Sequence, residues 1–95
     1  MSRAKVMVVE DESIVAIDIS QRLQSLGYEV TATVSSGEKA VEMAEKTRPD
    51  IILMDIVLKG EMGGIEAAEE INKRMKVPIV YITAYSDRKP SGGPR

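Results

Sequence analysis

Four short apolar runs, separated by longer stretches with helical spacing, constrain the fold of this chain more than any other feature. The runs cover residues 6–9, 29–34, 51–54 and 79–82, and they are rich in β-branched residues. Strands that alternate with helices through short connections form a parallel sheet with right-handed crossovers. The sequence therefore predicts an α/β fold, a doubly wound parallel sheet with helices on both faces.

The first of three expected helices, residues 13–26, is apolar on two sides. One stripe consists of Val15, Ile19, Leu23 and Leu26, while Ile14 and Ile17 lie on another side. This is more apolar surface than a helix with one buried stripe requires. The other two helices are expected over residues 35–46, which open with the capping-box pattern Ser35-x-x-Glu38, and over residues 65–75.

The composition is that of a single globular domain. The chain has 95 residues, of which 43% are hydrophobic and 29% charged, and it contains no cysteine and no histidine. With a net charge of −2 and no evident basic face, we expect no nucleic-acid partner. We also expect no membrane association, because no apolar run approaches the length that spans a bilayer. We expect a cytoplasmic protein with its domain over residues 1–87 and a flexible tail over residues 88–95.

Polar side chains follow three of the expected strands at the point where each strand ends. Glu10 and Asp11 follow the first strand, Asp55 ends the third, and Thr83 follows the fourth. Because the carboxyl ends of parallel strands meet at one edge of a sheet, we expect these side chains to converge. Three carboxylates in one crevice repel each other unless a cation joins them, and oxygen ligands without histidine or cysteine favour Mg²⁺. An aspartate beside Mg²⁺ is a known type of phosphoryl acceptor, and the Thr83 hydroxyl could bond to an oxygen of that group.

Each of these residues also has a simpler interpretation. Asp55 alone could open a turn, residues 10–13 could be an acidic helix start favoured by the helix dipole, and Thr83 could merely end a strand. We interpret the pair Gly63-Gly64 as a feature of loop geometry. The chain order of the whole set favours a shared site over these separate explanations.

The chain resembles the receiver domain of two-component response regulators. The resemblance covers residues 5–87 and rests on these motifs: Val8-Val9-Glu10-Asp11-Glu12, Pro49-Asp50-Ile51-Ile52-Leu53-Met54-Asp55, the loop to Gly64, and Pro78-Ile79-Val80-Tyr81-Ile82-Thr83-Ala84. It implies a flavodoxin-like fold, here with about four strands in the order 2-1-3-4 and three helices.

The resemblance also implies a site and a partner. Asp55 would accept a phosphoryl group from a phosphohistidine of a sensor histidine kinase or phosphotransfer protein. Asp11, Asp55 and the backbone carbonyl of Val57 would ligate Mg²⁺, with Glu10 acting directly or through water. Thr83 would be the switch hydroxyl that follows the phosphoryl group.

The sequence departs from the family pattern after Thr83. Receiver domains continue through a further helix, a fifth strand and a last helix, and we expect this chain to be C-terminally truncated before them. The pair Lys89-Pro90 comes too soon after Thr83 to take the role of the family's lysine. An unpaired fourth strand and a bare side of the first helix would then favour self-association, so we expect a homo-oligomer.

The leading interpretation is a phospho-acceptor receiver module of a two-component phosphorelay. Its alternative is a non-switching interaction or dimerisation module that keeps the fold without efficient phosphorylation. Neither is a conventional enzyme: the chemistry would be limited to self-phosphorylation from phosphohistidine or acetyl phosphate, and autodephosphorylation. An Mg²⁺-dependent phosphatase is a weaker alternative, because such enzymes need a second acid where Val57 stands.

Overall fold

The computed structural model describes residues 3–82 of the chain. Strands and helices alternate along it in this order: β1 (Lys5–Val9), α1 (Ser13–Ser25), β2 (Glu29–Val34), α2 (Gly37–Thr47), β3 (Ile51–Asp55), α3 (Gly64–Arg74) and β4 (Ile79–Ile82). These elements confirm the predicted order of four strands and three helices, and their ends lie within two residues of the predicted ones. Thr83 and the tail expected over residues 88–95 lie outside the described residues.

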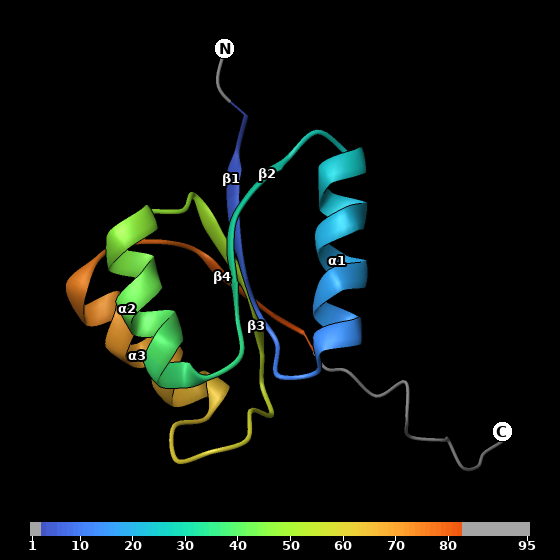
Figure 1. The fold of residues 1–95 in the computed structure, drawn as a ribbon. Coiled ribbons are helices and arrows are strands. Elements are labelled where there is room, and N and C mark those ends of the chain that lie inside the picture. The colour runs from blue at the N-terminus through green and yellow to red at the C-terminus, as the bar shows by residue number, and fades with distance from the viewer. Residues whose placement is uncertain (1–2, 83–95) are drawn as a thin grey trace, which may run out of the picture.

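The four strands form one parallel sheet in the order β2-β1-β3-β4, as predicted (Figure 1). β1 and β3 pair without interruption, from Val6 opposite Ile51 to Val9 opposite Met54. The pairing of β1 with β2 skips Thr31, which adds one residue to the edge strand. The two central strands, β1 and β3, therefore run in register up to the edge of the sheet, where Glu10 follows β1 and Asp55 ends β3.

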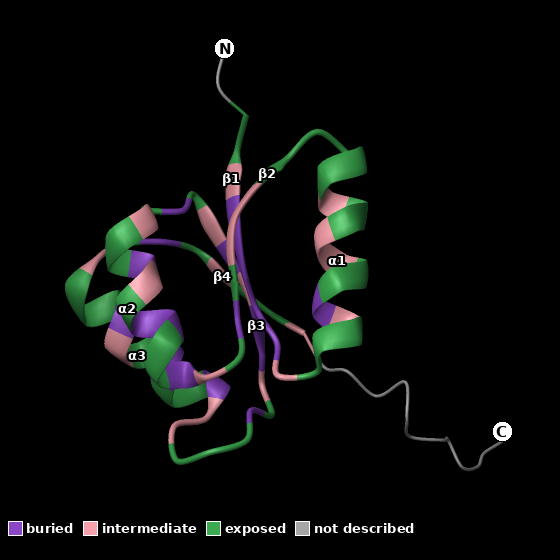
Figure 2. Cartoon of the chain, in the orientation of Figure 1, coloured by how far each residue is buried: buried purple, intermediate pink, exposed green. Residues whose placement is uncertain are grey.

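Helices cover both faces of the sheet, with α1 on one face and α2 and α3 on the other (Figure 1). The main core lies between the sheet and the pair α2 and α3, where buried residues concentrate (Figure 2). Its strand residues are Met7, Val9, Val34, Ile52 and Met54, and its helix residues include Ala40, Ala44, Ala67 and Ile71. Small residues on the helices allow α2 and α3 to approach the sheet closely, in a chain that has neither Phe nor Trp.

The face under α1 is less completely covered. Ala16 is the buried residue of this helix, while Val15, Ile19 and Leu23 are half-buried. Our prediction that Leu26 completes the buried stripe was wrong, because its side chain lies beyond the last helical turn and is 74% exposed. The second apolar side does face outward: Ile14 is 80% exposed and Ile17 is 57% exposed. The expected contact of these two side chains with a second copy of the chain stays a prediction.

The start of α2 differs from the predicted capping box. Ser36, not Ser35, caps the helix, and its hydroxyl oxygen accepts a hydrogen bond of 3.1 Å from the Lys39 N–H. Residue three of the helix is thus a lysine, so no glutamate returns the bond. A glutamate does hold the start of α3, where Glu66 Oε1 accepts from the Gly63 N–H at 2.8 Å.

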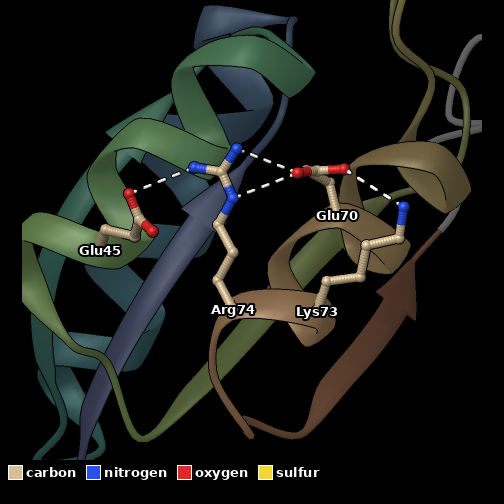
Figure 3. A network of polar contacts seen from close by, with 4 residues as sticks. All are labelled: Glu45, Glu70, Lys73 and Arg74. Atoms are coloured by element: carbon tan, nitrogen blue, oxygen red, sulfur yellow. Dashed lines mark hydrogen bonds and ion pairs between the residues drawn. The ribbon is translucent and has the colours of Figure 1, made fainter.

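An ion-pair network joins the exposed sides of α2 and α3 (Figure 3). The guanidinium of Arg74 donates to Glu70 on its own helix at 2.9 Å and to Glu45 on α2 at 3.2 Å. Lys73 pairs with Glu70 at 3.7 Å. The hydrogen bond to Glu70 is the main reason that the pKa of Arg74 is raised above its ordinary value. The network links the two helices that cover the main core. Among the described residues, no helix is long and apolar enough to cross a membrane.

Candidate functional site

Three carboxylates meet at the carboxyl edge of the two central strands. One carboxylate oxygen each from Glu10, Asp11 and Asp55 lies within 4.8 Å of the other two. The register explains this meeting, because the last residues paired across β1 and β3, Val9 and Met54, directly precede Glu10 and Asp55. Side chains alternate across a sheet, so these two carboxylates point to the face opposite the core residues before them. The structure thus brings together the acidic residues expected from sequence.

Glu10 is the most unusual member of this acidic cluster, because it is a buried acid with an incomplete hydrogen-bond set. Its side chain is 2% exposed. Oε2 accepts a hydrogen bond of 3.1 Å from the Glu12 N–H, whereas Oε1 is buried and has no hydrogen-bond partner among the described residues. Burial is the largest of the effects that together raise the pKa of Glu10 from 4.5 to about 7; the nearby charges of Asp55 and Asp11 add to it, and the Glu12 hydrogen bond opposes it. A cation in the cluster would remove this penalty.

Asp55 ends β3 with a side chain that is 3% exposed. Its Oδ1 accepts a hydrogen bond of 3.1 Å from the Val57 N–H, two residues further along the chain. This bond orients the carboxylate at the start of the β3–α3 loop. Val57 itself borders the site, and its side chain is 71% exposed. The metal-ligating role of the Val57 carbonyl stays a prediction.

Asp11 is held by the same loop, a contact that sequence reasoning missed. Its Oδ2 accepts a hydrogen bond of 3.1 Å from the backbone N–H of Lys59, 48 residues later in the chain. The donor is a backbone group that every residue except proline carries, so no side-chain pattern could have revealed it. The loop between β3 and α3 therefore supports two of the three carboxylates.

Gly64 is a second residue that the sequence reasoning missed, because that reasoning interprets the pair Gly63-Gly64 as loop geometry alone. In the structure Gly64 is the buried first residue of α3 and lies against the backbone of Asp55. A Cβ atom at Gly64 would overlap the carbonyl oxygen of Asp55 and lie 3.0 Å from its carbonyl carbon. Close backbone approach is a general use of glycine, and the doubled glycine before a helix was the available signal.

The donor set fits Mg²⁺. The ion takes oxygen ligands at about 2.1 Å, so two of its ligands lie at most about 4.2 Å apart, near the spacing of the three carboxylate oxygens. The buried Glu10 Oε1 without a partner is an independent sign that this cluster accommodates a cation or a bound water. Thr83, the predicted switch hydroxyl, lies outside the described residues.

The sequence matches the response regulator receiver domain family over residues 6–91. It is 38% identical over 84 residues to the transcriptional regulatory protein PdtaR of Mycobacterium tuberculosis, an alignment that covers 88% of this chain and 40% of that protein. It is 34% identical over 89 residues to the phyllosphere-induced regulator PhyR of Methylorubrum extorquens, covering 93% of this chain and 33% of PhyR. The chain thus spans two fifths or less of the length of these curated relatives.

Solved structures of receiver domains have the same fold. The signal receiver domain of a modulated diguanylate cyclase from Desulfovibrio desulfuricans G20 superposes with a TM-score of 0.82 at 39% identity, covering 88% of this chain and 67% of that one. PhyR from Bartonella quintana, in its complex with the anti-sigma factor NepR, superposes with a TM-score of 0.83 at 36% identity, covering 97% and 38%. On sequence and fold alike, this chain belongs to the response regulator receiver domain family.

Proposed function

We propose that this chain is a phospho-acceptor module in which Asp55 takes a phosphoryl group from a phosphohistidine on a sensor histidine kinase or phosphotransfer protein. The observation that carries the proposal is the convergence of Glu10, Asp11 and Asp55 within 4.8 Å at the carboxyl edge of β1 and β3. A structural role for three acids at this spacing is hard to justify, because their mutual repulsion destabilises the fold unless a cation is bound.

Asp55 is the nucleophile of the proposed transfer. The Val57 N–H holds Oδ1, so the carboxylate is oriented before the donor arrives. A carboxylate oxygen of Asp55 attacks the phosphorus, the phosphorus–nitrogen bond of the donor breaks, and its electron pair returns to the imidazole nitrogen. The products are an aspartyl phosphate on this chain and a free histidine on the donor.

Glu10 and Asp11 are the residues that would hold Mg²⁺ together with Asp55 and the Val57 carbonyl. When bound, Mg²⁺ neutralises charge on the phosphoryl oxygens and lowers the repulsion between them and the attacking carboxylate. The Lys59 N–H orients Asp11 through Oδ2, which leaves the other oxygen of Asp11 for the metal. Glu10, the most deeply buried of the three acids, acts directly or through a bound water. Thr83 is proposed as the hydroxyl that bonds to the transferred group.

Incubation of the 95-residue chain with acetyl phosphate and Mg²⁺, followed by intact mass spectrometry, tests the proposal. We expect one added phosphoryl group, absent without Mg²⁺ and absent in Asp55→Asn. The matched control is Asp18→Asn, which removes an exposed carboxylate of α1 that pairs with Arg22 and should leave the adduct intact. A wild-type chain that stays unmodified at saturating acetyl phosphate and Mg²⁺ would instead support a non-switching interaction module.

A further inference from the structure

The first turn of α3 packs directly on the peptide that carries the proposed phosphoryl acceptor. Gly64 is buried, and a Cβ atom built on it would overlap the carbonyl oxygen of Asp55 and approach Ile56 Cα to 3.0 Å. All of these neighbouring atoms belong to the backbone, so they cannot move aside as the end of a flexible side chain would. Any residue other than glycine must therefore push α3 and the end of β3 apart.

Space, and not backbone conformation, requires glycine at this position. The described glycines with positive φ are Gly27 and Gly60, at 96° and 103°, and Gly64 is not one of them. Gly64 is instead the first helical residue of α3, a conformation that any L-residue adopts. The effect of a substitution at Gly64 is thus steric and arises from contact with the backbone of Asp55 and Ile56.

The contact matters because the loop that it closes also holds the carboxylates of the site. The loop begins with the Val57 N–H on Asp55 Oδ1 and continues with the Lys59 N–H on Asp11 Oδ2, both at 3.1 Å. The Gly64 N–H then donates to the Ile56 carbonyl at 3.2 Å and returns the loop to its start. Displacing Gly64 would shift both ends of the loop, and with them the two donors.

We infer that Gly64 is a positioning residue for the Asp55 site: its contact with the Asp55 peptide sets the loop that orients the carboxylates of Asp55 and Asp11 for Mg²⁺. The inference rests on the proposed function. By this inference, the first turn of α3 stabilises the arrangement of the site in addition to covering the core.

The test compares Gly64→Ala with Gly63→Ala by Mg²⁺ titration, followed in ¹H–¹⁵N NMR spectra. Gly63 is the matched control, because it precedes Gly64 at the same helix start, has a φ of −80°, and would place its Cβ 3.8 Å from the nearest neighbouring atom. The titration observes folded molecules only, so a loss of stability lowers signal intensity without changing the dissociation constant. We expect Gly64→Ala to weaken Mg²⁺ binding at least about tenfold and Gly63→Ala to stay within about twofold of wild type.

If Gly64→Ala does not fold, a second pair of variants decides the question. Glu66→Ala removes the acceptor of the Gly63 N–H and so loosens the first turn of α3, without adding an atom near Asp55. Glu69→Ala, the control, changes an exposed acid on the same helix. We expect Mg²⁺ binding to weaken at least about threefold in Glu66→Ala and to be unchanged in Glu69→Ala.

Equal Mg²⁺ affinity in wild type and a folded Gly64→Ala, or equal losses in Gly64→Ala and Gly63→Ala, would overturn the inference and leave the proposed function standing. In the second pair, equal affinities in Glu66→Ala and Glu69→Ala would do the same. A wild-type chain that binds no Mg²⁺ would refute the proposed metal site, and the role of Gly64 with it.

Discussion

Removing the charge of Glu10 should stabilise the metal-free protein, although it removes a residue of the proposed site. The variant Glu10→Gln keeps the shape of the side chain, and its amide oxygen can still accept the hydrogen bond that the Glu12 N–H donates to Oε2. Its amide nitrogen provides a donor at the position of the unpartnered Oε1, beside the carboxylates of Asp11 and Asp55. The substitution thus turns three converging acids into two acids and a donor.

The magnitude and the pH dependence follow from the raised pKa of Glu10. Below about pH 4.5 this residue is protonated in both the folded and the unfolded chain, and it carries no charge penalty. Between pH 4.5 and 7 the unfolded chain loses the proton while the folded chain keeps it, so the free energy of unfolding falls as pH rises. Above pH 7 the full penalty applies, and a pKa of about 7 in place of 4.5 corresponds to about 3 kcal/mol.

Urea unfolding followed by circular dichroism, in EDTA at pH values from 5 to 8, measures this difference. We expect Glu10→Gln to exceed wild type by about 3 kcal/mol at pH 8, with a difference that shrinks as the pH falls towards 5. Glu12→Gln, a change of the exposed neighbouring acid, is the control and should show no such trend. Added Mg²⁺ at pH 8 should stabilise wild type more than Glu10→Gln. The reasoning is refuted if Glu10→Gln is no more stable than wild type in EDTA at pH 8.

Two further substitutions test the fold around the site, both by urea unfolding. Arg48 follows the last residue of α2 with a left-handed φ of 49° and an exposed side chain, so Arg48→Gly should raise the free energy of unfolding by about 1 kcal/mol. Lys46→Gly, inside the last turn of α2, should lower the free energy of unfolding by a similar amount. A destabilised Arg48→Gly would contradict this reasoning. Ile52 is fully buried in the main core, so Ile52→Ala should cost about 3 kcal/mol, more than Ile51→Ala on the half-covered face. Equal losses at both positions would show that the two faces are packed alike.

Much of the fold follows from local pattern. Short apolar runs between helical stretches predicted the parallel sheet with right-handed crossovers, and the resemblance to receiver domains implied its strand order. The acids at the strand ends followed from the same argument, since strands that pair in parallel end at one edge. Glu10, Asp11 and Asp55 could therefore be grouped from the sequence alone.

The sequence predictions are wrong at two helix ends, where a tertiary contact decides the structure and the sequence pattern does not. Ser35 and Ser36 fit a helix cap equally well by type, and the backbone of the loop after β2 selects Ser36. Leu26 has the spacing of the buried stripe, but the helix ends before its side chain can reach the sheet. The last residue of a helix is set by a single turn of backbone. If the helix ends one residue earlier than expected, a side chain expected to be buried becomes exposed.

The sequence by itself determined which residues can share a site, because their types and their places after strands require no knowledge of distance. The tertiary structure decided how that site is held. The burial of Glu10, the Lys59 N–H on Asp11 and the fit of Gly64 against Asp55 depend on backbone atoms far apart in sequence that approach within a few ångströms. Backbone groups are the same at nearly every position, so composition and spacing carry no record of the Lys59 contact, and the glycine pair is the one sequence signal of the contact at Gly64.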